Sequence, residues 1–328
     1  MDFITEKQRD ILLEAFRELD KSSPVFPSPE EAVMNAAIML SMPSVFAEGH
    51  ECYGENGEKD ELLARIIAYR YYSIADYLSD ESNHDYILFR SFFTQISNTM
   101  AAIIRLTESG FDYQAISLNR NIVELFMMLI VIADSSELRK KVYSAKTVNS
   151  ANDLWKQNFS KTKFIKMISP YSESFSHLVD SVDEWTRQIY KELSSFAHND
   201  YANVLTYSLS EIDSTGEAHP NFWGKYITRK AEIYHRLVST IAPLDLILCS
   251  ILKDPKKDVS LFSLYKADKD YDSMMNYFRA NTLRSICMIL YSDISKREKI
   301  KDHVPVPLCK IQRSPTDETK PFFVDEHR

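Results

Sequence analysis

Glycine is scarce in this chain, which holds six glycines among 328 residues, whereas an average protein contains about 7% glycine. They lie at positions 49, 54, 57, 110, 216 and 224, and none belongs to a GxGxxG or GxxxxGK[ST] phosphate-binding loop. A doubly wound α/β fold needs more turn glycines than this. The composition therefore argues against nucleotide binding through either loop, and it predicts a mostly helical protein.

Cysteine is also sparse, and its spacing follows no metal-binding pattern. The four cysteines lie far apart and form no CxxC pair: Cys52, Cys249, Cys287 and Cys309. Neither a zinc site nor a disulfide framework is indicated, so we expect no metal, no other cofactor and a reducing, cytoplasmic location. The first residues, MDFITEKQRDILLEAF, lack the basic and then apolar order of a signal peptide.

Long apolar runs are missing as well. The most apolar stretch, Ile122–Ala133, is 12 residues long and contains Glu124, whereas a membrane-spanning helix needs about 20 apolar residues. We therefore expect no membrane contact and predict that this stretch is a buried core helix.

Charge is unevenly placed in a chain whose formal net charge is -8. Residues 1–110 carry 9 Lys and Arg against 19 Asp and Glu, whereas the remaining residues carry 30 against 28. A polyanion is therefore expected to meet the later two thirds of the chain. The alternative is that acidic helix faces in the first third serve solubility alone.

Apolar residues recur at three- and four-residue spacing almost throughout, which predicts an all-α fold, a multi-helix bundle. Residues 47–60 are expected to form a loop, and Gly110 to be a left-handed cap between two antiparallel helices. Helices are expected near residues 5–19, 29–42, 60–79, 84–109, 112–134, 136–146, 150–158, 173–197, 221–252 and 270–296.

The chain is expected to divide into three regions. Residues 1–80 would form an acidic helical cap, residues 81–297 the main helical bundle, and residues 298–328 an extended or mobile tail. Pro305 and Pro307 interrupt any helix in that tail. A single domain without a separate cap is the alternative.

A charged pair lies inside the most apolar predicted helix. Arg120 and Glu124 are four residues apart, so both side chains lie on one helix face and can interact. Their apolar neighbours predict burial, which is costly for a charge unless it is paired. Two interpretations stay open: a structural ion pair that ties two helices together, or a guanidinium and a carboxylate that line a polar cleft.

A second feature is the segment 190–201, YKELSSFAHNDY. Ser194 and His198 are four residues apart, so a helix places the hydroxyl and the imidazole on one face. The following Asn199-Asp200 can end this helix and leave His198 at the mouth of a cleft, where a general acid or base is useful. The alternative is a histidine that is hydrogen-bonded at a helix end, and GxSxG is absent.

These two motifs, an Arg-x-x-x-Glu helix and a later Leu-Ser-x-x-x-His helix end, resemble those of an uncharacterised group of bacterial helical proteins. That group is distantly similar to the HEPN superfamily (higher eukaryote and prokaryote nucleotide-binding), often met in toxin and phage-defence systems. The resemblance covers about residues 84–210. It implies an HEPN-like core, and metal-independent cleavage of an RNA backbone by an arginine and a histidine at a homodimer interface.

The chain departs from the ribonuclease pattern of that superfamily, in which four to six residues separate the arginine from the histidine. Here ten residues separate Arg187 from His198, and Lys191 stands seven positions before the histidine. Only His198 carries over, with Arg120 from another helix as a substitute.

The predicted function is action on RNA or a nucleotide by a defence or toxin protein, as a metal-independent ribonuclease. The alternative is a non-catalytic helical sensor or protein-interaction module, in which these residues only specify the core. The expected catalytic residues are His198, Arg120 and Ser194, and the expected binding residues are Glu124, Asn121, Lys191 and Tyr201.

A tyrosine-rich segment offers a further candidate surface. Tyr69, Tyr71, Tyr72 and Tyr77 with Arg65 and Arg70 could stack against bases, but their helical spacing favours the edge of a core.

Overall fold

The computed structural model of the protein describes several stretches of the chain, and these stretches are helical almost throughout. These are residues 5–22, 28–33, 55–79, 82–159, 161–168, 187, 189, 191, 193, 230–254, 265–266 and 268–297. No strand occurs among them, so the all-α prediction is confirmed, whereas an HEPN-like core stays a prediction. The predicted tail, residues 298–328, lies outside the described residues.

The helices follow one another in a simple order along the chain. Their bounds are α1 (Glu6–Ser22), α3 (Glu55–Tyr77), α4 (His84–Glu108), α5 (Asp112–Asp134), α6 (Ser136–Ser144), α7 (Val148–Leu154), the π-helix η1 (Trp155–Phe159), α8 (Lys161–Ile168), α11 (Lys230–Lys253) and α13 (Tyr271–Arg297).

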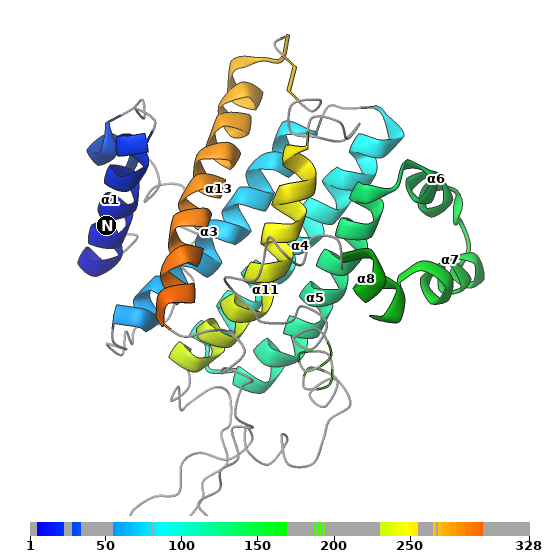
Figure 1. Ribbon diagram of the computed structural model, residues 1–328, viewed down its shortest axis with the longest axis horizontal. Coiled ribbons are helices and arrows are strands. Elements are labelled where there is room, and N and C mark those ends of the chain that lie inside the picture. Colours follow the sequence, from blue (N-terminus) through cyan, green and yellow to red (C-terminus); the bar gives the residue numbers. More distant parts are fainter. Residues whose placement is uncertain are drawn as a thin grey trace, which may run out of the picture.

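Within the described part of the chain, five long helices form the bundle (Figure 1). α3 packs against α4, α4 against α5, α5 against α11 and α11 against α3, while α13 packs against α3. α1 lies at one edge, beside α3 and α13, and the short elements α6, η1 and α8 pack on α5 at the opposite edge. α3 therefore packs within the predicted main bundle, and a division of the chain near residue 80 stays a prediction.

The α4–α5 hairpin carries the first predicted site motif, and local signals set its limits. Asn83 caps α4, since its side chain accepts a hydrogen bond from the Asp85 N–H at 2.8 Å. Gly110 has a φ of 74°, a conformation that is costly for other residues. The predicted ranges 84–109 and 112–134 are confirmed to within one residue, and Gly110 is the left-handed cap.

The beginning of α3 corrects the sequence prediction. Residues 47–60 were expected to be a loop, but α3 begins at Glu55 and contains Gly57. Tertiary contacts outweigh the helix penalty of glycine here, because the Thr5 hydroxyl donates to the Glu58 carboxylate at 3.1 Å and Asp60 is buried. A second correction concerns residues 150–158, where α7 gives way to the π-helix η1 at Trp155.

Two helices are long and apolar enough to cross a membrane by length and hydropathy alone, residues 112–134 and 230–252. In the bundle, 61% and 89% of their most apolar windows are buried, and a buried core helix passes the same test. Ile122, Phe126 and Ile130 on α5 are fully buried, which confirms the predicted core helix. The cytoplasmic location stays a prediction.

A buried carboxylate joins three of the long helices. Asp245 on α11 is fully buried and accepts hydrogen bonds from both terminal nitrogens of Arg70 on α3. It also accepts from the Tyr71 hydroxyl and, at 2.7 Å, from the Tyr291 hydroxyl on α13. We call these four residues the Asp245 hub; Pro243, two residues before Asp245, lies inside α11.

The Asp245 hub generates a stability prediction. Asp245→Asn should lower the free energy of unfolding by about 3 to 5 kcal/mol, because it leaves the buried Arg70 guanidinium without a charged partner. Urea denaturation followed by circular dichroism measures the loss. The control is Asp153→Asn on exposed α7, which should change the free energy by less than about 0.5 kcal/mol; an equally small effect at Asp245 would contradict the hub.

Candidate functional site

A surface groove of about 470 Å³ lies between α4 and α5. Its polar lining consists of Gln95, Asn98 and Thr99 from α4 and of Asn121 and Glu124 from α5. Its apolar lining consists of Ala102, Leu118, Leu125 and Met128. The volume falls within the range of small-molecule sites, which combine apolar walls with a few polar groups.

The groove residues share one face of each helix because of their spacing. Gln95, Asn98 and Ala102 recur at three- and four-residue intervals on α4, as do Leu118, Asn121 and Leu125 on α5. The carboxamides of Gln95, Asn98 and Asn121 are exposed. They therefore present both donors and acceptors to a ligand in the groove.

The predicted Arg120–Glu124 pair forms at this groove. Arg120 Nε donates to Glu124 Oε1 at 3.0 Å, and Glu124 lines the groove. The two side chains are 22% and 23% exposed, so the pair is partly buried and the expected burial is only partly met. Neither side chain lies in the core, because three- and four-residue spacing directs Ile122 and Phe126 there instead.

The second motif falls largely in the part of the chain that is not described. Ser194, His198 and Tyr201 lie outside the described residues, so their roles and their distance to Arg120 stay predictions. Lys191 is described, and it is helical and exposed. Ile189 and Leu193 are helical and buried, whereas Lys191 between them is exposed.

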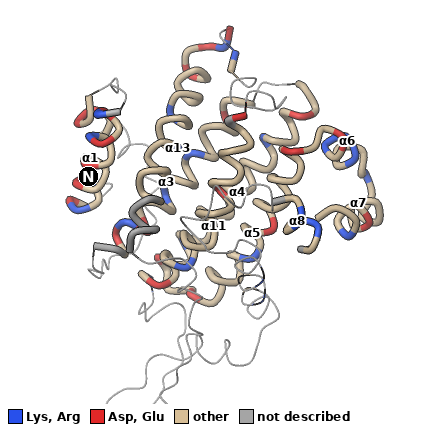
Figure 2. The backbone as a smooth tube through the Cα atoms, viewed as in Figure 1, with Lys and Arg blue, Asp and Glu red and all other residues tan. Residues whose placement is uncertain are grey.

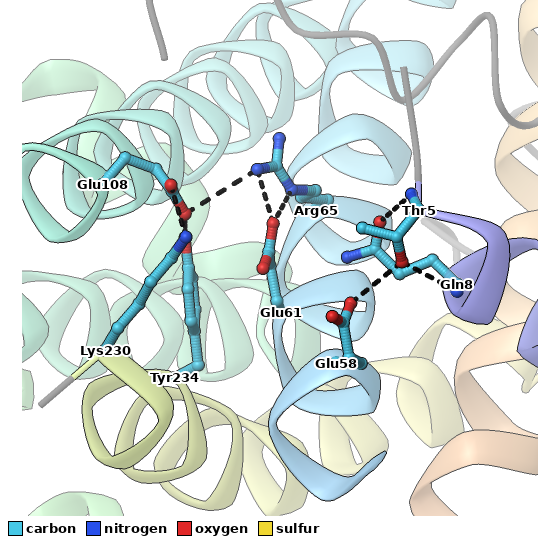
Figure 3. A network of polar contacts seen from close by, with 8 residues as sticks. All are labelled: Thr5, Gln8, Glu58, Glu61, Arg65, Glu108, Lys230 and Tyr234. Atoms are coloured by element: carbon cyan, nitrogen blue, oxygen red, sulfur yellow. Dashed lines mark hydrogen bonds and ion pairs between the residues drawn. The ribbon is translucent and has the colours of Figure 1, made fainter. Parts of the chain in front are cut away.

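A buried charge network that the sequence analysis did not anticipate joins α3, α4 and α11 (Figure 3). At its centre Glu108 accepts hydrogen bonds from Lys230 Nζ at 2.5 Å and from the Tyr234 hydroxyl at 2.6 Å. Arg65 donates to Glu61 at 2.6 and 2.9 Å and lies 3.8 Å from Glu108. We call these five residues the Glu108 network; their mutual pairing is typical of a structural cluster.

A histidine adjoins the Glu108 network. His235 Nδ1 lies 3.0 Å from the carboxylate of Asp60, and His235 Nε2 lies 3.4 Å from the Ser239 hydroxyl. Asp60 and Ser239 are buried, and both His235 and Ser239 lie on α11, four residues apart. The arrangement holds the imidazole in place, but a buried serine in the middle of a helix is not accessible to a substrate.

The remaining sequence candidates are structural. Tyr71 and Tyr77 are buried, as are Arg65 and Arg70, whereas Tyr72 is 49% exposed, so the tyrosine-rich core edge is confirmed. Within the described stretches, no group of three His, Cys, Asp or Glu residues is arranged to hold a metal.

The difference in exposure between two ion pairs generates a prediction. Glu124→Gln should lower the free energy of unfolding by at most about 1 kcal/mol, because its pair with Arg120 is partly solvated. Glu108→Gln should cost about 3 kcal/mol or more, because it removes the charged partner of buried Lys230. Urea denaturation compares the two variants, and equal losses would show that the Arg120–Glu124 pair bears more of the stability than its exposure indicates.

Three buried tyrosines generate a pH prediction. Burial, followed by nearby carboxylates, raises the pKa of Tyr71, Tyr234 and Tyr291 well above the usual value. Above about pH 10 the unfolded chain loses these protons while the folded chain keeps them, so stability falls as the pH rises.

Each such tyrosine contributes a slope of about 1.4 kcal/mol per pH unit. Urea titrations between about pH 9 and 11 should therefore show a smaller slope for Tyr234→Phe than for the wild type. The exposed Tyr72 provides the control, since Tyr72→Phe should leave the slope unchanged. An identical slope in both variants would contradict the raised pKa of Tyr234.

Comparison with known proteins gives no relative of this chain. The chain matches no protein-family model, no curated protein and no solved structure. The resemblance to the HEPN superfamily therefore rests on the Arg120–Glu124 and Ser194–His198 motifs alone, and it stays a prediction.

Proposed function

We propose that this protein acts on RNA or a nucleotide and that the α4–α5 groove binds a base of that ligand. The observation that carries the proposal is the lining of the groove, in which exposed carboxamides and one carboxylate stand among apolar side chains. Asn and Gln pair with adenine through two hydrogen bonds, and Glu accepts from the cytosine amino group. Leu118, Leu125 and Met128 offer apolar surface to the face of the ring.

Arg120 is the proposed phosphate contact. Its guanidinium is one-fifth exposed and is held against the rim of the groove by Glu124. A guanidinium matches the geometry of a phosphate group and keeps its charge at every relevant pH. A base in the groove would therefore bring its own phosphate toward a fixed positive charge.

Catalysis in this proposal belongs to His198 and to Ser194, four residues earlier in the sequence. The imidazole would accept the proton of a ribose 2′-hydroxyl, whose oxygen attacks the adjacent phosphorus. The bond to the 5′ oxygen breaks, and this oxygen takes up a proton from water to leave as a hydroxyl. A guanidinium stabilises the charge that develops on the phosphoryl oxygens. Such a ribonuclease of defence or toxin type would work as a homodimer, as the HEPN resemblance implies, and without metal.

The rival function is a non-catalytic sensor or interaction module. One observation favours it: Arg120 and Glu124 satisfy each other at 3.0 Å, as a purely structural pair would. In that case the groove binds its ligand, and no bond is cleaved.

Binding to the groove is tested by calorimetry with adenosine monophosphate. Gln95→Ala should weaken binding about tenfold, the loss expected for one base-reading amide, whereas Gln114→Ala, exposed on α5 outside the groove, should not change it. Equal affinities of the two variants for adenosine monophosphate would contradict the binding of a base in this groove.

Cleavage of total cellular RNA with and without a chelator then separates the two functions. If His198 is the acid or base, His198→Ala should lower the rate at least about 100-fold without lowering the melting temperature. His235→Ala is the matched control, because loss of its contact with Asp60 should lower stability and leave the specific activity of the folded fraction unchanged. Binding without any cleavage by the wild type would favour the sensor.

A further inference from the structure

Positive charge is concentrated in the short elements at one edge of the bundle, which we call the basic lobe (residues 136–168, spanning α6, α7, η1 and α8). Its exposed acidic residues are Glu137 and Asp153. Figure 2 shows the basic residues around α6 and α8, at the edge opposite α1. Six of the lysines in the lobe are exposed: Lys140, Lys141, Lys146, Lys156, Lys163 and Lys166. This edge is therefore positive in a chain whose net charge is -8.

Ion pairing neutralises little of this charge. Lys141 pairs with Glu137 at 2.7 Å, one helical turn away. Within the described stretches, the other five exposed lysines form no ion pair. Lysine side chains that face solvent without carboxylates beside them attract anions, and the attraction adds up over a cluster.

The basic lobe packs against the bundle, so the backbone that carries its lysines is held in position. Arg139 is fully buried and donates to the carbonyl oxygens of Ile132 at 2.9 Å and Ala133 at 3.4 Å, the last turn of α5. Its Nε lies 3.1 Å from Asp85 at the beginning of α4. Phe159 and Phe164 are buried as well, so one face of η1 and one face of α8 pack against the core.

An aromatic stack lies in the same lobe. The Tyr143 ring, on α6, stacks on the His84 ring with centroids 3.9 Å apart and an interplanar angle of 16°. Tyr143 is 42% exposed, and it lies two residues from Lys141. Exposed aromatic rings beside lysines are the usual platform for the bases of single-stranded nucleic acid.

We propose that the basic lobe docks the phosphodiester backbone of single-stranded RNA, with its lysines on the phosphates and Tyr143 beneath one base. The inference rests on the proposed function in taking RNA as the polyanion, but it concerns a different surface from the groove. Lysine contacts to phosphate give affinity without sequence specificity. The basic lobe would hold the strand, while the groove reads a base.

The composition of the basic lobe favours RNA over an anionic membrane as its partner. Interfacial membrane helices bury large apolar side chains beneath the headgroups, and Val148 is the one aliphatic side chain among the exposed large hydrophobic residues in the described part of the lobe. The stacked Tyr143 ring instead suits a planar base.

Fluorescence anisotropy with a labelled uridine 20-mer tests the proposal at several salt concentrations. The triple variant Lys140→Gln, Lys163→Gln, Lys166→Gln should bind about tenfold more weakly at low salt, and the slope of log affinity against log salt should fall by about 2, since each phosphate contact contributes about 0.7. The triple variant Lys7→Gln, Arg9→Gln, Arg17→Gln on α1 changes the net charge equally and removes exposed side chains at the far edge. It should keep the wild-type slope.

Protection of the lysines provides a second measurement on the unchanged protein. Bound RNA should shield the lysines of the basic lobe from acetylation, as read by mass spectrometry, and leave Lys7 reactive. Equal losses in the two triple variants, or acetylation unaffected by RNA, would overturn the proposal. So would binding to phosphatidylserine vesicles without binding to RNA.

The groove experiment remains independent of this outcome. A wild type that binds adenosine monophosphate but not the 20-mer would overturn the basic lobe as an RNA surface and leave the groove proposal intact. If the wild type binds the 20-mer and Gln95→Ala leaves the affinity for adenosine monophosphate unchanged, the basic lobe is supported as an RNA surface and the groove proposal is overturned.

Discussion

The buried carboxylate of Asp245 is the constraint on which the arrangement of the long helices depends. An ionised group in an apolar interior is stable only when charged and polar partners surround it. Its partners come from α3 and α13, so neither helix can slide along α11 by a turn without stranding either Arg70 or Tyr291. Hydrophobic burial would tolerate many such slips; the Asp245 hub restricts the bundle to one register.

The Glu108 network likewise joins α3 to α11 through buried charged and polar side chains, nearer to the beginning of both helices. Glu61 and Arg65 come from the first half of α3, Glu108 from the end of α4, and Lys230 and Tyr234 from the beginning of α11. Two buried polar clusters thus fix α3 against α11 at separate points. The α4–α5 groove lies outside both clusters, and so does the basic lobe on α6, α7, η1 and α8.

Sequence reasoning succeeded where the signal was local. The limits of the α4–α5 hairpin follow from neighbouring residues, Asn83 and Gly110, and the Arg120–Glu124 contact follows from a four-residue spacing on one helix. The groove itself was not predictable, because it depends on how two helix faces are turned relative to each other. The prediction for His198 rests on its four-residue spacing from Ser194, and both residues lie outside the described part of the chain.

The Glu108 network and the Asp245 hub were missed for a different reason. Their members are separated by 122 residues between Glu108 and Lys230 and by 175 between Arg70 and Asp245, so no local pattern links them. One signal was present: Asp245 interrupts the apolar run Ile241–Ile251, as Glu124 interrupts the run in α5. A charge in such a run indicates a distant partner but does not identify it.

Pro243 separates the two clusters within α11. A proline has no N–H, so the carbonyl of Ser239, one turn earlier, has no helical partner. Fewer backbone hydrogen bonds therefore hold the two halves of the helix together at this point than elsewhere along it. We expect amide hydrogen exchange to treat α11 as two cooperative units, in which the segment that carries Lys230 and His235 opens while the segment that carries Asp245 stays closed.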